Sequence, residues 1–171
     1  MKIWSIQSEA AFRQLAEHGV LYARPYDEDE AFKRAYGWMK EQMIRRIGEP
    51  PLPGVNPVWG WYQYQSARKR RPDLRQAAHV KSGEKAVRLA LELPDAGVLL
   101  SDFDLWHYVL NDWHLPLHEQ DQSADNQWEK IFDLDWYAEG IADPREQKSI
   151  QATFWSIEYA AIREMTWFIG R

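Results

Sequence analysis

Segments in which apolar and polar residues alternate are mixed with segments of helical spacing along this chain of 171 residues. They do not follow the regular strand–helix–strand order of a parallel sheet. Between residues 86 and 93, Val and Leu alternate with other residue types, which predicts a strand. Between Phe32 and Ile47, apolar residues recur at three- and four-residue spacing, which predicts an amphipathic helix. Such mixing favours an α+β fold: a single mixed, mainly antiparallel sheet with helices packed on it. We expect a single domain over residues 1–171, because this length suits one core.

Capping residues mark the ends of the helices. Ser8 is expected to begin a helix that Gly19 ends, and Asp27 to begin the longer one. Either Ser101 or Asp102 is expected to cap a helix ending near Asn111. Further strands are expected at 2–7, 20–24, 58–65, 98–100, 151–157 and 165–169, and further helices around 128–132 and 158–164.

Composition narrows the classes of function. The chain has no Cys, so disulfides and thiolate zinc sites are excluded. The start is not a signal peptide, and no apolar run approaches the roughly 20 residues of a membrane helix. We therefore expect a cytoplasmic protein without membrane contact. His114 and His118 are separated by Pro116, which breaks the helical spacing of a metal pair, and no metal site is predicted.

The sequence from residue 57 to 75, PVWGWYQYQSARKRRPDLR, is the strongest indication of a binding site. The chain is tryptophan-rich, and an aromatic strand at 58–65 carries Trp59, Trp61 and Tyr64. A basic loop at 68–75 follows and ends at Arg75, in a protein whose formal net charge is −5. Aromatic rings stack on bases and cations neutralise phosphates, so the pattern indicates a nucleotide or single-stranded nucleic acid. The alternative is a solvated surface loop.

A second group of polar residues lies in SDFDLWHYVLN, from Ser101 to Asn111. On a helix, Asp104, His107 and Asn111 share one face. A carboxylate from Asp102 or Asp104 beside the His107 imidazole is an arrangement used in general acid–base catalysis. The alternative is a capping Asp and a hydrogen-bonded, half-buried His.

The late strand offers a third group. Alternation places Gln151, Thr153 and Trp155 on one face, where an amide, a hydroxyl and an indole can bind a ribose. They can equally be the polar face of an edge strand. Neither the phosphate-loop motif nor the dinucleotide glycine fingerprint occurs.

Several of these segments resemble a bacterial family known as domain of unknown function 3841. The resemblance rests on IWSIQS, PVWGWYQY, RPDLR, VLLSDFDLWHYVLN, WEKIFDL and IQATFW, and extends from residue 3 to residue 171. It implies a small cytoplasmic bacterial protein with no established activity. It also draws attention to Arg75, Asp102, His107 and Gln151.

The opening order of strand, helix, glycine and strand is similar, more remotely, to ADP-ribosyltransferase-like folds. Those folds often begin with an aromatic–His–x–Thr run, which Trp4 to Gln7 would occupy here, and carry an acidic residue or Gln on a late strand. Ser5 stands where the family has His, and Gln151 where active transferases usually have Glu. These departures weigh against nicotinamide cleavage, because Gln cannot act as a base, although it can hydrogen-bond a ribose. NAD or another nucleotide is the implied ligand.

Three functions remain open. The first is a nucleotide pocket in which Trp61 or Tyr64 stacks the base, Arg75 holds phosphate, and Gln7 and Gln151 hold the ribose. Trp59, Asn111 and Trp155 are further candidate ligand-binding residues, and His107 with Asp102 or Asp104 would move a proton. The second is a non-enzymatic module that binds RNA or single-stranded DNA through the aromatic strand and the basic loop. A protein-binding surface built from Trp residues is a third alternative.

Overall fold

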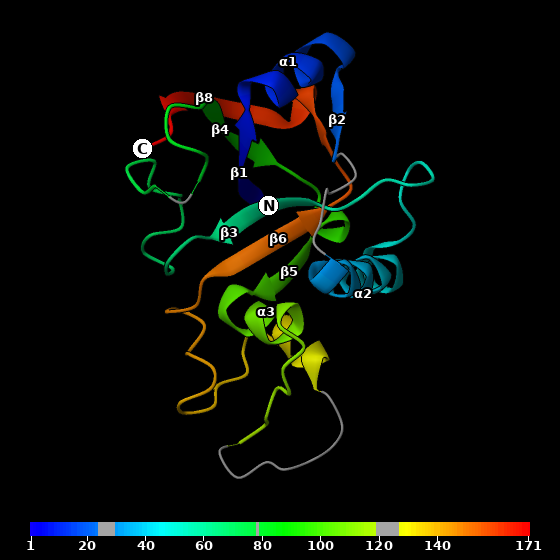
Figure 1. Cartoon of the computed structure of the whole chain (residues 1–171), viewed down its shortest axis with the longest axis vertical. Helices are drawn as coiled ribbons and strands as arrows, with labels where there is room; N and C mark the ends of the chain where they lie inside the picture. Colours follow the sequence, from blue (N-terminus) through cyan, green and yellow to red (C-terminus); the bar gives the residue numbers. More distant parts are fainter. Residues whose placement is uncertain (24–29, 78, 119–126) are drawn as a thin grey trace.

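In the computed structural model, which describes residues 1–23, 30–77, 79–118 and 127–171, a six-stranded sheet forms the centre of the molecule (Figure 1). Its strand order is β5-β6-β3-β1-β4-β8, and every pairing is antiparallel. The strands are β1 (Lys2–Ser8), β3 (Val58–Gln63), β4 (Lys85–Glu92), β5 (Leu99–Asp102), β6 (Ile150–Phe154) and β8 (Ile162–Ile169). In addition, β2 (Val20–Tyr22) and β7 (Ser156–Glu158) form a two-stranded sheet. The predicted α+β class with a mainly antiparallel sheet is confirmed.

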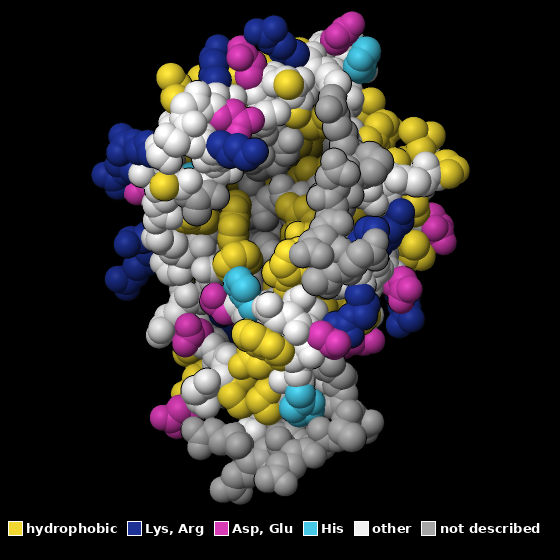
Figure 2. Space-filling model, viewed as in Figure 1, with side chains coloured by type: hydrophobic (Ala, Val, Ile, Leu, Met, Phe, Trp, Pro, Cys, Tyr) yellow, Lys and Arg dark blue, Asp and Glu magenta, His cyan; other side chains and the backbone are white. Residues whose placement is uncertain are grey.

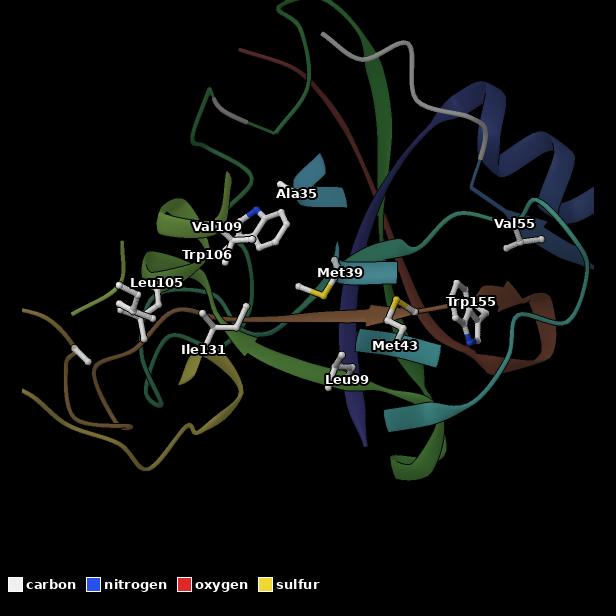
Figure 3. Packing of buried hydrophobic residues seen from close by; sticks show 12 residues of the cluster. Ala35, Met39, Met43, Val55, Leu99, Leu105, Trp106, Val109, Ile131 and Trp155 are labelled. Carbon is white, nitrogen blue, oxygen red and sulfur yellow. The ribbon is translucent and has the colours of Figure 1, made fainter. Parts of the chain in front are cut away.

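Helices cover both faces of the large sheet. On one face, α2 (Glu30–Ile47) and α3 (Phe103–Leu110) pack with a 3₁₀ turn at Trp128–Phe132. Their core contains Met39, Met43, Leu99 and Trp106, which Figure 3 labels among the buried residues of this cluster. On the other face, Leu15 of α1 (Glu9–His18) packs against Ile3, Val87, Leu89 and Leu91. Burial of these residues is the main stabilising term of such a fold.

The predicted caps are present at two helices. The Ser8 side chain accepts a hydrogen bond from the Ala11 N–H at 3.2 Å, and Gly19 ends α1 at φ 75°, where a side chain would be strained. Asp102 caps α3 by accepting hydrogen bonds from the N–H groups of Asp104 and Leu105. The cap expected at Asp27 lies outside the described residues.

Two predictions near the end of the chain are wrong. The helix expected at 158–164 is only a three-residue 3₁₀ turn, Tyr159–Ala161, after which the chain enters β8. Pairing with β4 explains the difference, because backbone groups at the edge of β4 gain hydrogen-bond partners from residue 162 onward. The strand expected at 151–157 is divided at Trp155, so that β6 joins the large sheet and β7 the small one.

Gly60 lies in β3 at a position that has no room for a side chain. A Cβ at this position would lie 2.9 Å from Ile3 Cγ2 and 2.9 Å from the Trp4 carbonyl oxygen. We therefore expect Gly60→Ala to lower the free energy of unfolding by about 1–3 kcal/mol, measured by urea denaturation. Gly37→Ala is the matched control: it meets nothing within 4 Å on α2 and should stabilise by about 0.5–1 kcal/mol. Equal effects at the two glycines would contradict this account of the packing.

Candidate functional site

A pocket of about 570 Å³ lies on the face of the sheet that α2 and α3 partly cover. Figure 2 shows this view of the molecule hollowed at its centre, with hydrophobic side chains along the hollow. The pocket combines strand residues from β1, β3 and β6 with side chains from both helices and two loops. Its lining residues are Ile6, Tyr36, Trp59, Gly60, Trp61, Tyr64, Gln65, His79, Phe103, Trp106, Ser149 and Gln151.

Aromatic rings form the walls of this pocket, which we call the aromatic pocket. The Trp61 ring makes edge contacts with Tyr64 and Phe103, both at 4.9 Å between ring centroids. Trp59 lies 5.3 Å from Trp106 of α3, and its ring also meets α2. These contacts fix the rings in place before any ligand binds, so little side-chain freedom remains to be lost on binding.

Gln151 provides a polar group between these walls. Its side chain is only 4% exposed, and its Nε2 donates a hydrogen bond to Ser101 Oγ at 3.0 Å. Among the described residues, no group donates to its Oε1. A primary amide has two donors and an acceptor oxygen with two lone pairs, and leaving such groups unpaired in a buried place is costly. The Gln151 oxygen is therefore an acceptor available to a ligand in the pocket.

Four of the residues singled out from the sequence come together here: Trp59, Trp61, Tyr64 and Gln151. Strand register is the reason. Trp61 of β3 lies opposite Gln151 of β6, and Trp59 opposite Thr153, so their side chains project from the same face of the sheet. Tyr64 follows β3 directly, and its hydroxyl donates a hydrogen bond to Gln76 Oε1. Burial and the nearby Asp73 carboxylate raise the pKa of the Tyr64 phenol.

Gln7 and Trp155 lie away from the aromatic pocket. Gln7 alternates to the opposite face of β1, where its Nε2 donates to Ser5 Oγ at 2.8 Å. Trp155 is 9% exposed in the core beside Met43, as Figure 3 shows, and its Nε1 donates to the Gly48 carbonyl at 3.0 Å. Both side chains have partners within the protein.

Arg75 and Asn111 are exposed and also lie outside that lining. The Arg75 guanidinium donates to both carboxylate oxygens of Asp73, with the shortest distance 2.6 Å, and this pairing holds the pKa of Asp73 well below its usual range. Asn111 ends α3, and its side-chain Nδ2 donates to the His107 carbonyl at 2.8 Å. Arg75 borders a neighbouring basic pocket instead.

Asp102 is buried in an ion pair that the sequence does not reveal. Its Oδ2 accepts a hydrogen bond from Lys148 Nζ at 2.6 Å, and the two side chains are 2% and 1% exposed. Its Oδ1 accepts the N–H groups of Asp104 and Leu105 at the start of α3. Both carboxylate oxygens are therefore bonded within the protein. By capping α3 they position Phe103 in the wall of the pocket.

His107 stands behind that wall. Its ring lies 4.9 Å from the Phe103 ring, and its Nδ1 donates to the Phe103 carbonyl at 3.0 Å. No hydrogen bond joins His107 to Asp102 or Asp104 in the described part of the chain. Partial burial and the neighbouring Asp102 charge raise the pKa of Asp104. Catalytic roles for His107, Asp102 and Gln151 thus remain predictions.

Several residues of the pocket lining were not expected from the sequence. His79 borders the pocket, with its ring 5.4 Å from Tyr64 and its Nε2 within 2.9 Å of the Asp73 carbonyl. Tyr36 and Ser149 come from α2 and from the turn before β6. The RPDLR run just before His79 could have drawn attention to this loop. The contributions of Tyr36 and Ser149 depend on tertiary packing, which the local sequence does not show.

The described residues contain no cluster of three His, Asp or Glu side chains that could hold a metal ion. Nor does any helix in the four described ranges have the length and apolar character needed to cross a membrane.

Two solved structures of DarT from Thermus sp. 2.9 are similar to this chain. The first, in complex with NAD+, is 16% identical, with a TM-score of 0.40 over 96% of this chain and 80% of that one. The second, in complex with ADP-ribosylated ssDNA, is 19% identical, with a TM-score of 0.36 over 96% and 79%.

Among curated proteins, no match is found. The family of domain of unknown function DUF3841 has a model that matches residues 2–127, a span containing the aromatic strand, the basic loop and α3. The chain therefore belongs to the DUF3841 family.

Proposed function

We propose that the protein binds a nucleotide, or the nucleotide end of a larger molecule, in the aromatic pocket. The observation that carries this proposal is the buried Gln151 amide, whose Oε1 has no donor among the described residues while aromatic rings surround it. Ribose hydroxyls and base amino groups are donors that suit this oxygen. Flat rings suit the space beside Trp61 and Tyr64, because bases stack on aromatic side chains.

Binding rather than group transfer is what the chain's own residues support. Gln151 has no ionisable group, and Asp102 is engaged on both carboxylate oxygens. NAD and ADP-ribose belong among the ligands to test, since both carry the adenosine that the pocket would hold.

The second candidate function is binding of RNA or single-stranded DNA along the basic loop. The observation that favours it is the exposure of Arg68, Lys69 and Arg71, whose side chains form no ion pair with any described residue. This function predicts an affinity that falls steeply with salt concentration, because phosphate contacts release counterions. Stacking in a recessed pocket predicts a smaller salt dependence.

A thermal-shift screen of the purified protein tests the two functions together. The panel contains NAD, ADP-ribose, nucleoside mono- and triphosphates, and short RNA and DNA oligomers, each at low and high salt. The aromatic pocket predicts a rise in melting temperature with a small nucleotide that persists at high salt. A rise only with oligomers, lost at high salt, would favour the nucleic-acid module. No rise with any compound would contradict both.

A further inference from the structure

A second pocket, of about 850 Å³, lies beside the aromatic pocket, and Gln65 borders both. We call it the basic pocket, because seven Lys or Arg side chains and two carboxylates line it. Both carboxylates are already paired: Asp73 with Arg75 at 2.6 Å, and Glu164 with Lys2 at 2.8 Å. The remaining positive charge therefore has no counterpart among the lining residues, in a protein that is acidic as a whole.

Arg88 is the most buried cation of this lining. It lies in the middle of β4 and is 9% exposed, yet it forms no ion pair with any described residue. Its guanidinium donates to the Pro72 carbonyl at 2.8 Å and to Thr166 Oγ1 at 3.3 Å. Two of its five N–H donors are thus satisfied by neutral groups. A buried charge is ordinarily paired, because removing it from water is costly. Arg88 has no such anionic partner among the described residues.

The electrostatic surroundings of Arg88 agree with this. Burial lowers the pKa of Arg88, and the positive charge of Arg71 lowers it further. The negative charges of Glu164 and Asp73 raise the pKa of Arg88, but each has a smaller effect than burial or Arg71. The lining of the basic pocket, with seven cations and two carboxylates, carries an excess of positive charge.

The rim of the pocket is held by backbone hydrogen bonds. The loop after β3 doubles back as a tight turn, in which the Tyr64 N–H donates to the Arg70 carbonyl at 2.9 Å and the Gln65 N–H to the Lys69 carbonyl at 3.2 Å. Arg68, Lys69 and Arg71 are exposed on this turn. Figure 2 shows Lys and Arg side chains along the left edge of the view, on the side where Figure 1 places the chain between β3 and β4.

We propose that the basic pocket binds a phosphate group, with the Arg88 guanidinium at its buried end and Arg71 and Lys69 at its rim. Phosphate fits because its oxygens accept charge-assisted hydrogen bonds from several donors at once and match the fork of a guanidinium. The proposal is independent of nucleotide binding in the aromatic pocket, since free phosphate or pyrophosphate is expected to bind alone. Gln65 lines both pockets, so a nucleotide in the aromatic pocket would have this anion site beside it.

Isothermal titration calorimetry with phosphate and with pyrophosphate tests the site, with added chloride holding the ionic strength constant. We expect both anions to bind, and Arg71→Gln to weaken pyrophosphate binding by about tenfold or more, because hydrogen bonds to charged groups are strong. Arg88→Met is expected to abolish the binding while leaving the melting temperature in phosphate-free buffer unchanged or raised. Arg13→Gln is the matched control, because Arg13 is exposed on α1 and lines neither pocket, and it should bind as the wild type does.

Two results would overturn the proposal. One is that neither anion binds the wild-type protein, whether or not an oligonucleotide binds. The other is that Arg71→Gln binds pyrophosphate as tightly as Arg13→Gln does. Because Arg71 is exposed, its variant decides the matter even where Arg88→Met fails to fold. Phosphate binding without nucleotide binding would leave this site standing and refute the aromatic pocket alone.

Discussion

Replacing Lys148 with Met is expected to lower the free energy of unfolding by about 3–5 kcal/mol, because it leaves the Asp102 carboxylate buried without its partner. The two side chains are 1% and 2% exposed, and 2.6 Å separates Lys148 Nζ from Asp102 Oδ2. The Lys148 carbonyl also accepts a hydrogen bond from Gln63 Nε2 at 2.6 Å, so this residue ties the end of β3 to the start of α3. Urea denaturation followed by circular dichroism measures the loss.

Asp102→Asn is the informative companion, since Asn also caps helices well and removes only the charge. It too should destabilise, by leaving the Lys148 ammonium buried and unpaired. The double variant, Asp102→Asn with Lys148→Met, should recover much of the stability, because no uncompensated charge remains. Losses below about 1 kcal/mol in both single variants, as for an exposed ion pair, would contradict the buried pairing.

Trp61→Ala is expected to weaken nucleotide binding about 5- to 150-fold, which corresponds to a stacking contribution of about 1–3 kcal/mol. The Trp61 ring lines the aromatic pocket between Tyr64 and Phe103, and its loss leaves a base without that face. Titration calorimetry with the nucleotide that gives the largest thermal shift measures the change.

Trp113→Ala is the matched control for that measurement. Trp113 is 57% exposed and lies outside the pocket lining, so its removal should leave the dissociation constant unchanged. If both variants bind equally well, the ligand does not stack on Trp61. Melting temperatures of the two unliganded variants show whether either has lost the fold.

Local signals in the sequence predicted the elements that have local causes. Ser8 and Gly19 mark the ends of α1 because capping depends on nearby residues. Residues 158–164 have a local pattern that favours a helix, whereas pairing with the edge of β4 favours a strand from residue 162 onward. The order of the six strands depends on long-range pairings that periodicity does not specify.

The sequence predicted those residues of the candidate site that lie on strands with clear alternation. Alternation along two strands placed Trp59 with Trp61 and singled out Gln151, and the observed register brings them to one pocket. The same alternation sends Gln7 to the opposite face, which becomes evident only once β1 is aligned with β3. Lys148 lies in an acidic, weakly patterned stretch, so nothing local distinguishes it from a solvated lysine.

NMR of protein labelled with fluorotryptophan tests the proposed nucleotide site, because it reports where a nucleotide binds. Each nucleoside monophosphate is titrated separately, and the tryptophan signals are assigned by substitution. We expect the signals of Trp59, Trp61 and Trp106 to shift together, while those of the exposed Trp113 and Trp167 stay in place. Shifts confined to Trp113 or Trp167, or no shift with any nucleotide, would contradict a nucleotide site in the aromatic pocket.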